Sequence, residues 1–156
     1  MSQFVKYIID TSALINAWHL YYPPKNFPTL WDKLTKIIKN GYLKAPLEVF
    51  DELEEGGDDL YKWAKDLKTY LFEERDEIQD LVVDILHQFP YWANRDDADP
   101  FVIAMAQFYN ASIICCEKPD GRKNPAEIRK IPDACRALGI RYLHFYQLVV
   151  EKEWSF

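Results

Sequence analysis

Glycine is scarce in this sequence, with five residues among 156. Their positions allow neither a P-loop nor a G-x-G-x-x-G fingerprint, the two motifs that hold nucleotide phosphates on a glycine-rich turn. The sequence also has no G-x-S-x-G motif, and its three histidines lie far apart along the chain. These absences exclude nucleotide binding by a glycine-rich loop and disfavour Ser/His or Cys/His catalysis.

Cysteine gives no sign of a disulfide framework or a zinc site. There are three cysteines, Cys115, Cys116 and Cys135, and their spacing matches neither C-x-x-C nor a Cys/His zinc motif. We therefore expect buried, reduced thiols.

Long apolar runs and targeting segments are also missing. No window approaches eighteen uninterrupted apolar residues, and the N-terminus lacks the basic, apolar and small-residue order of a signal peptide. The composition is 49% hydrophobic and 15% aromatic, enough for one well-cored domain, whereas the length is too short for two ordinary ones. We expect a single domain over residues 1–156, cytoplasmic and without a membrane partner.

The formal net charge of −6 argues against the broad electropositive surface of a nonspecific nucleic-acid binder. It does not exclude a nucleic-acid enzyme, because catalytic metal ions can reverse the local field of an acidic site.

Hydrophobic patterning predicts strands that alternate with helices. Strands are expected over residues 4–9, 42–45, 111–116 and 142–145, and helices begin near residues 13, 29, 46, 60, 78, 100, 132 and 147. The strands are apolar runs rather than strict alternations, which is typical of a parallel sheet covered on both faces. The expected fold class is therefore α/β.

Two of the strongest predicted strands end in an acid, at Asp10 and at Glu117. The carboxyl ends of parallel strands meet at one edge of the sheet, where ligand sites lie. Asp99, which we expect to cap the helix that begins at the next residue, should stand at the same edge, together with Asp97. Such a cluster would repel itself unless a divalent cation neutralised it, and oxygen ligands favour Mg²⁺ or Mn²⁺.

Each acid also has an ordinary structural explanation. Asp10 and Asp99 could serve only as helix N-caps, although Ser12 could replace Asp10 in that role. Glu117 alone could be a solvated loop residue. The coincidence of acids at one predicted edge is what favours a site.

A further acid lies on the helix expected over residues 46–55. At about 100° per residue, Glu52 falls roughly 60° from Val49 and borders the apolar arc, whereas Glu48 lies farther from it. A solvated acidic helix face explains the same pattern equally well.

Four motifs together resemble a known family. They are YIIDTSALI, VFDELE, ADPFVIAMA and SIICCEK, in this order, followed by the closing segment IPDACRALGIRYLHFYQLV. Over nearly its full length the chain resembles the PIN domain of VapC-type toxin ribonucleases, and most closely the uncharacterised PIN-like DUF4411 group. The resemblance implies a three-layer α/β/α sandwich with a central, mainly parallel sheet of about four or five strands, and an acidic pocket that binds Mg²⁺ or Mn²⁺ to hydrolyse RNA.

The resemblance also implies roles for individual residues. The candidate catalytic residues are Asp10, Ser12, Glu52, Asp99 and Glu117, and the candidate metal ligands are Asp10, Asp99 and Glu117. Asp97 departs from the family pattern and is a further candidate ligand that could share the metal or replace one of the three. It favours Glu52 over Glu48 as the helix acid. The fourth acid of the family is usually Asp, so the longer Glu117 leaves open how it would reach a metal.

The predicted loop after Glu117 is locally basic, with five Lys or Arg against two acids over residues 118–130. We expect it to steer phosphate toward the acidic pocket, although an exposed solubilising loop explains it as well. The candidate substrate-binding residues are Thr11, Lys118, Arg122 and Lys123.

The sequence thus predicts a metal-dependent endoribonuclease in which carboxylates hold one or two hard cations that activate water. By resemblance it would be the toxin of a type II toxin–antitoxin pair, with an antitoxin protein as partner and a homodimeric state. The alternative is a catalytically degenerate PIN-like module that binds RNA or protein. A phosphatase of the haloacid dehalogenase type is disfavoured, because Ser12 stands where that chemistry needs a second acid.

Overall fold

The computed structural model describes residues 4–156. The strands in this range are β1 (Tyr7–Ile9), β2 (Leu43–Pro46), β3 (Phe72–Glu73), β4 (Ser112–Ile114) and β5 (Tyr142–Leu143). The α-helices are α1 (Thr11–Asn16), α2 (Pro28–Lys39), α3 (Leu47–Gly56), α4 (Asp59–Asp66), α5 (Lys68–Leu71), α6 (Asp76–Gln88), α7 (Asp99–Tyr109), α8 (Ile131–Leu138) and α9 (Phe145–Glu151). A π-helical segment, η1 (Ala17–Tyr21), and two 3₁₀ turns, η2 (Pro90–Trp92) and η3 (Pro125–Glu127), complete the elements.

The strands form one five-stranded sheet in the order β3-β2-β1-β4-β5, and every neighbouring pair is parallel. The predicted parallel sheet is therefore confirmed. Tyr7 of the central strand β1 lies in register with Leu43 of β2 and Ser112 of β4. Three of the four expected strands were too wide, the strand expected over residues 42–45 lies one residue later, and the two-residue edge strand β3 was not predicted.

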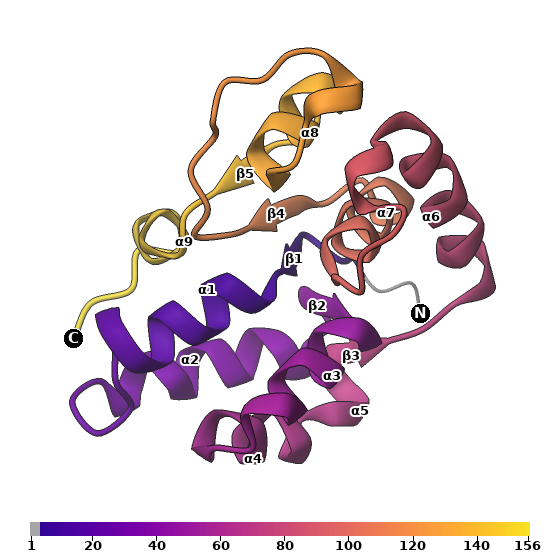
Figure 1. Cartoon of the computed structure of the whole chain (residues 1–156). Coiled ribbons are helices and arrows are strands. Elements are labelled where there is room, and N and C mark those ends of the chain that lie inside the picture. The colour runs from indigo at the N-terminus through magenta and orange to yellow at the C-terminus, as the bar shows by residue number, and fades with distance from the viewer. Residues whose placement is uncertain (1–3) are drawn as a thin grey trace.

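Helices cover both faces of the sheet, as the predicted three-layer sandwich requires (Figure 1). On one face α7 packs against β1, β2 and β4, and α6 and α8 pack against α7. Figure 1 shows α1, α2 and α9 on the other side of the sheet, with α3, α4 and α5 gathered beside β2 and β3.

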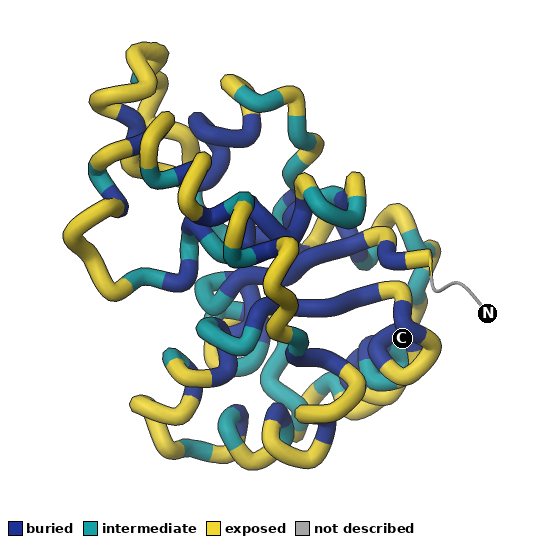
Figure 2. The backbone as a smooth tube through the Cα atoms, turned by 90° about the vertical axis from the view of Figure 1, so that its right-hand side faces the viewer, coloured by how far each residue is buried: buried dark blue, intermediate teal, exposed yellow. Residues whose placement is uncertain are grey.

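The core follows the strands through the middle of the molecule (Figure 2). Ile8 and Ile9 of β1 and Ile113 and Ile114 of β4 are fully buried, which explains why these strands are apolar at every position rather than at every second one. β2 departs from this apolar pattern, because it contains Lys44, a charged residue whose side chain is buried. Its Nζ lies 3.6 Å from Glu73 Oε2 on the neighbouring strand, so the buried charge is paired.

Two predicted helix N-termini were wrong in detail. The helix expected to begin near residue 29, with Thr29 and Asp32 as a capping box, begins at Pro28, whose fixed φ suits the first helical turn, and no side chain caps it. Asp99 is not an N-cap either. It lies in the first turn of α7 after Ala98, and its carboxylate makes no capping bond.

The thiols match the expectation in part. Cys115, Cys116 and Cys135 are all free, and two of them are buried, while Cys116 is half-buried. Burial raises the pKa of Cys135 to about 12, so this thiol is protonated and unreactive at neutral pH.

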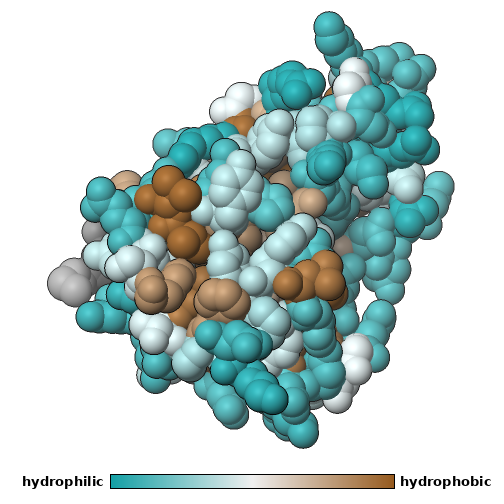
Figure 3. Space-filling view, turned by 90° about the vertical axis from the view of Figure 1, so that its left-hand side faces the viewer, coloured by the Kyte–Doolittle hydropathy of each residue, from teal (hydrophilic) through white to brown (hydrophobic). Residues whose placement is uncertain are grey.

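Aromatic side chains near α2 pack mostly inward. The Trp18 ring lies 4.9 Å from that of Trp31, which lies 5.1 Å from that of Trp63. Leu20 and Tyr21 of η1 remain exposed. Figure 3 shows the face that includes η1 and α9, where apolar side chains are scattered among polar ones.

The helices also bear on membrane association. Over residues 4–156, none of them has both the length and the apolar character needed to cross a bilayer.

Candidate active site

A cavity of about 460 Å³ opens at the edge of the sheet where β1 and β4 end. Its lining residues are Asp10, Thr11, Ser12, Ile15, Glu52, Glu55, Tyr91, Trp92, Arg95, Asp97, Asp99, Glu117, Arg129 and Lys130. The parallel sheet creates this arrangement, because β1 leads into Asp10 and β4 leads toward Glu117 on the adjacent strand.

Most residues predicted for the site line this one cavity. All five candidate catalytic residues do so, as do Asp97 and Thr11. Glu48 does not line it, but borders an adjoining acidic pocket.

The basic candidates Lys118, Arg122 and Lys123 do not line the cavity. Arg122 and Lys123 border a separate cavity of about 100 Å³ beside α8. Asp120 helps to hold Arg122 away from the acidic cavity, because its carboxylate pairs with the Arg122 side chain at 3.3 Å. Their role in substrate binding stays a prediction.

Asp10 is held rigidly at the floor of the cavity. Its carboxylate caps α1 by accepting the Ala13 N–H at 2.9 Å, and the Ser12 hydroxyl lies 2.9 Å from both of its oxygens. The Ser12 hydroxyl in turn accepts the Cys116 N–H at 3.2 Å, which ties the loop after β4 to α1. Asp10 is therefore the N-cap, and Ser12 orients it rather than replacing it.

Burial raises the pKa of the Asp10 carboxyl well above its usual range, and the bonds from Ala13 and Ser12 offset only part of this effect. The nearby carboxylates of Asp99 and Glu117 raise the pKa further. The fold thus holds a desolvated acid next to two others.

Glu52 reaches the cavity from α3. The Thr11 hydroxyl donates a hydrogen bond to its Oε1, and the Ala98 N–H donates one of 3.5 Å to its Oε2. Glu52 therefore connects the starts of α1 and α7. Burial, followed by repulsion from Asp97 and Glu55, raises its pKa, while these two hydrogen bonds lower it.

Asp99 enters the cavity from the first turn of α7. Burial and the carboxylates of Glu117, Asp97 and Glu52 raise its pKa to about 7, while a side-chain hydrogen bond from Trp92 lowers it. Because the Asp99 carboxylate makes no capping bond, it is available to a ligand in the cavity.

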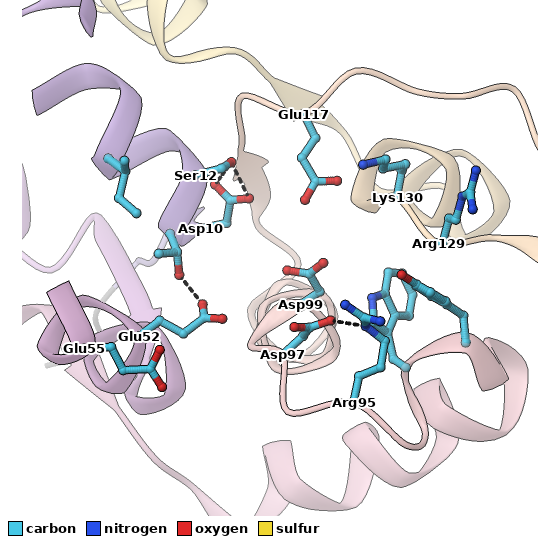
Figure 4. A pocket seen from close by; sticks show the side chains of 14 residues that line it. Asp10, Ser12, Glu52, Glu55, Arg95, Asp97, Asp99, Glu117, Arg129 and Lys130 are labelled. Carbon is cyan, nitrogen blue, oxygen red and sulfur yellow. Dashed lines mark hydrogen bonds and ion pairs between the residues drawn. The ribbon is translucent and has the colours of Figure 1, made fainter. Parts of the chain in front are cut away.

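Glu117 stands across the cavity and accepts the N–H of Ile131 at 3.3 Å, at the start of α8. Burial raises its pKa, whereas this hydrogen bond and the charge of Lys130 lower it. In Figure 4 the Lys130 side chain extends toward Glu117.

Asp97 is paired with a cation. Arg95 Nε lies 2.8 Å from Asp97 Oδ2, and both side chains are partly exposed. Any metal held by Asp97 would share this carboxylate with Arg95.

The carboxylates match Mg²⁺ or Mn²⁺ in donor chemistry, because each is an oxygen ligand and several are desolvated without a neighbouring cation. Within residues 4–156, however, no three His, Cys, Asp or Glu side chains are grouped to hold one ion. The site therefore suits these metals because it offers oxygen donors that repel one another, and not because the side chains already form a coordination shell.

Comparison with known proteins agrees with the fold. The family described as a domain of unknown function, DUF4411, matches residues 7–156. The chain belongs to the DUF4411 family. Among curated proteins, none matches its sequence.

A solved structure also resembles this DUF4411 chain. It is VapBC2 from Rickettsia felis bound to a DNA fragment from their promoter, with a TM-score of 0.54 and 12% sequence identity, covering 90% of this chain and 99% of the other. At this identity the likeness concerns the fold, and the DUF4411 chain has the PIN-like fold that its motifs predicted.

Two opposite walls of the cavity in this DUF4411 chain differ in charge (Figure 4). Glu52 and Glu55 line one wall, from α3. Across the carboxylates of the floor, Arg95, Arg129 and Lys130 line the other. A bound anion would therefore meet cations on one side and acids on the other.

Sequence reasoning missed much of the cationic wall. Tyr91, Trp92 and Arg95 come from a segment for which the sequence predicted neither a helix nor a strand, and they line the cavity from η2, which packs against η3, and from the turn after it. The available signal was the close spacing of two aromatic residues and one arginine in YWANR, just before the acids of the predicted site.

Proposed function

We propose that this protein is a metal-dependent endoribonuclease that hydrolyses RNA phosphodiesters. The observation that supports it best is the gathering of Asp10, Glu52, Asp99 and Glu117 around one cavity whose far wall is cationic. Acids that repel one another in a desolvated site suit a hard cation, and the cationic wall suits a phosphate chain.

In this proposal some residues bind the metal and others orient the carboxylates. Ser12 fixes both oxygens of Asp10, while Thr11 and the Ala98 N–H fix Glu52. The carboxylates of Asp10, Asp99 and Glu117 would hold Mg²⁺ or Mn²⁺, and Asp97 would contribute a further oxygen. A bound metal of this kind supplies an activated water and offsets the charge that develops on the phosphate.

We further propose that the chain is the toxin of a type II toxin–antitoxin pair acting in the cytoplasm. The support is the fold it shares with a chain of the VapBC2 complex, which is bound to promoter DNA. An antitoxin protein would be its partner, and a homodimer its state in solution. Co-purification with the product of an adjacent gene tests the first point, and sedimentation equilibrium tests the second.

The test of the nuclease is cleavage of RNA with Mg²⁺, with Mn²⁺ and with EDTA. We expect wild-type protein to cut only with metal, leaving 5′-phosphate and 3′-hydroxyl ends, and Asp10→Asn to lose at least a hundredfold in rate. Asp96→Asn is the matched control, because Asp96 is exposed and does not line the cavity. Equal cleavage by wild type and Asp10→Asn would assign the activity to a contaminant.

The alternative is a PIN-like module that binds RNA or protein without cleaving. It is favoured by the absence of a grouped ligand set in residues 4–156 and by Glu117 in place of the usual Asp. Calorimetric titration with Mn²⁺ discriminates, because a degenerate site binds no metal stoichiometrically.

A further inference from the structure

The cationic wall contains a stacked aromatic and basic pair that the proposed chemistry does not use. The Arg95 guanidinium lies over the Tyr91 ring, 4.8 Å from its centroid, and both residues line the cavity. Tyr91 is half-buried, and the Arg95 side chain is 49% exposed. Flat surfaces of both residues are thus available at the cavity wall.

The pair is held in place by its surroundings. Tyr91 is flanked along the chain by Phe89 and Trp92 through the turn η2, and the rings of these two neighbours are buried in contact, 5.9 Å apart. Arg95 is fixed on its other side by the 2.8 Å ion pair with Asp97. Little conformational entropy is therefore lost when a ligand stacks on the pair.

The neighbouring charges indicate the kind of ligand. Arg129 and Lys130 line the same wall. Arg129 is paired with Asp120 at 3.2 Å, whereas Lys130 makes no ion pair with the other residues that the structure describes. A phosphate chain passing these cations would carry its bases within reach of the stacked pair. Planar π-faces beside cations are the elements that bind single-stranded nucleic acid.

We infer that Tyr91 and Arg95 form a stacking platform for one unpaired base of a single-stranded RNA, next to the phosphate that is cut. This inference rests on the proposed function for the identity of the substrate. A base in a duplex is stacked on its neighbours and exposes no free face, so the platform selects single-stranded segments and loops over paired RNA. It specifies no base identity, because every base has a π-face.

The experiment measures binding with EDTA present, so that no cleavage is needed. A 12-nucleotide RNA with a single 2-aminopurine, moved one position at a time, is titrated with the full chain, and fluorescence reports which base stacks. Affinity is measured by anisotropy for the same strand alone and annealed to its complement. Tyr91→Ala, Arg95→Gln and Tyr70→Ala are compared.

Tyr70 is the matched control, because it is 47% exposed and also stacks with a cation, Lys39 Nζ lying 5.7 Å from its ring centroid, but it does not line the cavity. We expect Tyr91→Ala to weaken single-strand binding about five- to hundredfold. The salt dependence should not change, because no charge is removed. Tyr70→Ala should match wild type.

Quenching at one position in the wild-type complex, lost in Tyr91→Ala and weakened in Arg95→Gln, supports the platform. Uniform fluorescence along the strand, equal affinity for the duplex, or Tyr91→Ala behaving like Tyr70→Ala overturns it. The wild-type scan decides the question even if Tyr91→Ala does not fold. Cleavage with Mn²⁺ is scored separately: a stacked base without cleavage refutes the nuclease alone, and cleavage without a stacked base refutes the platform alone.

Discussion

The Ser12 hydroxyl lies 2.9 Å from each carboxylate oxygen of Asp10 and accepts the Cys116 N–H at 3.2 Å. One side chain thus joins residues that follow β1 and β4, two neighbouring strands of the sheet. Its removal would both loosen Asp10 and leave the Cys116 N–H without a partner.

We therefore predict that Ser12→Ala lowers RNA cleavage about tenfold or more and reduces the free energy of unfolding by about 1–2 kcal/mol. Single-turnover rates with Mn²⁺ and urea denaturation measure the two effects. Ser12→Thr, which retains the hydroxyl, is the control. An unchanged rate in Ser12→Ala would show that Asp10 needs no such support.

Asp99 predicts a pH-dependent stability of the metal-free protein. Its pKa is raised to about 7 in the fold, against about 3.9 in an unfolded chain. Between these values the folded state keeps a proton that the unfolded state releases, so stability falls as pH rises through this window.

The Asp99→Asn variant has no carboxyl to titrate at this position, so it does not lose stability as the pH rises. In EDTA at pH 8 the variant should be more stable than wild type by about 4 kcal/mol, and at pH 4 the difference should nearly vanish. Urea denaturation at the two pH values measures it, with the exposed neighbour Asp96→Asn as control. A variant less stable than wild type at pH 8 would mean that the Asp99 charge is already compensated.

Glu117 can be tested without disturbing the loop that it supports. Glu117→Gln removes the charge but keeps an oxygen that can accept the Ile131 N–H. We predict normal unfolding behaviour and at least a tenfold loss of Mn²⁺ affinity by calorimetry. Mn²⁺ affinity equal to that of wild type would exclude Glu117 as a ligand.

The buried carboxylate of Asp133 anchors the basic loop over residues 118–130, and this role can be tested. The Asp133 side chain is fully buried and accepts the N–H groups of Asp120 and Gly121 at 2.9 and 3.1 Å. Asp133→Ala leaves both donors without this partner, so we expect a loss of about 2–3 kcal/mol in unfolding free energy. Hydrogen exchange should quicken over residues 118–130, and Asp133→Asn should show a smaller effect. Unchanged exchange would contradict the anchoring role.

The basic residues of this loop can be ranked by position. Lys130 lines the cavity and Lys123 does not, so Lys130→Gln should weaken single-stranded RNA binding more than Lys123→Gln. The slope of log affinity against log salt should fall by about 0.7 for Lys130→Gln. If Lys123→Gln has the larger effect, RNA enters over the outer loop instead.

The sequence predicted the sheet and its acidic edge for one physical reason. Strands buried on both faces are apolar throughout, so the points where β1 and β4 end, before Asp10 and Glu117, are visible as the first charges after an apolar run. Once the strands are parallel, these acids must lie at one edge.

Other features depend on packing and leave no local pattern. β3 has only two residues, and its place in the sheet depends on pairing with Ala45 and Pro46 of β2. The contribution of Tyr91 and Arg95 to the cavity depends on contact between η2 and η3. The position of Arg122 follows from its pairing with Asp120, whose backbone is anchored to Asp133.

The position of β1 in the sheet has a consequence for synthesis of the protein. β1 pairs with β2 on one side and with β4, more than a hundred residues later, on the other. A nascent chain that has emerged only through α6 already carries Asp10 and Glu52, yet it has neither Asp99 nor Glu117 to complete the pocket. Long-range parallel pairing of this kind forms late and slowly. The acids of the pocket therefore come together only after β4 has been translated and has joined the sheet. Earlier in synthesis, the ribosome carries a chain whose pocket is incomplete.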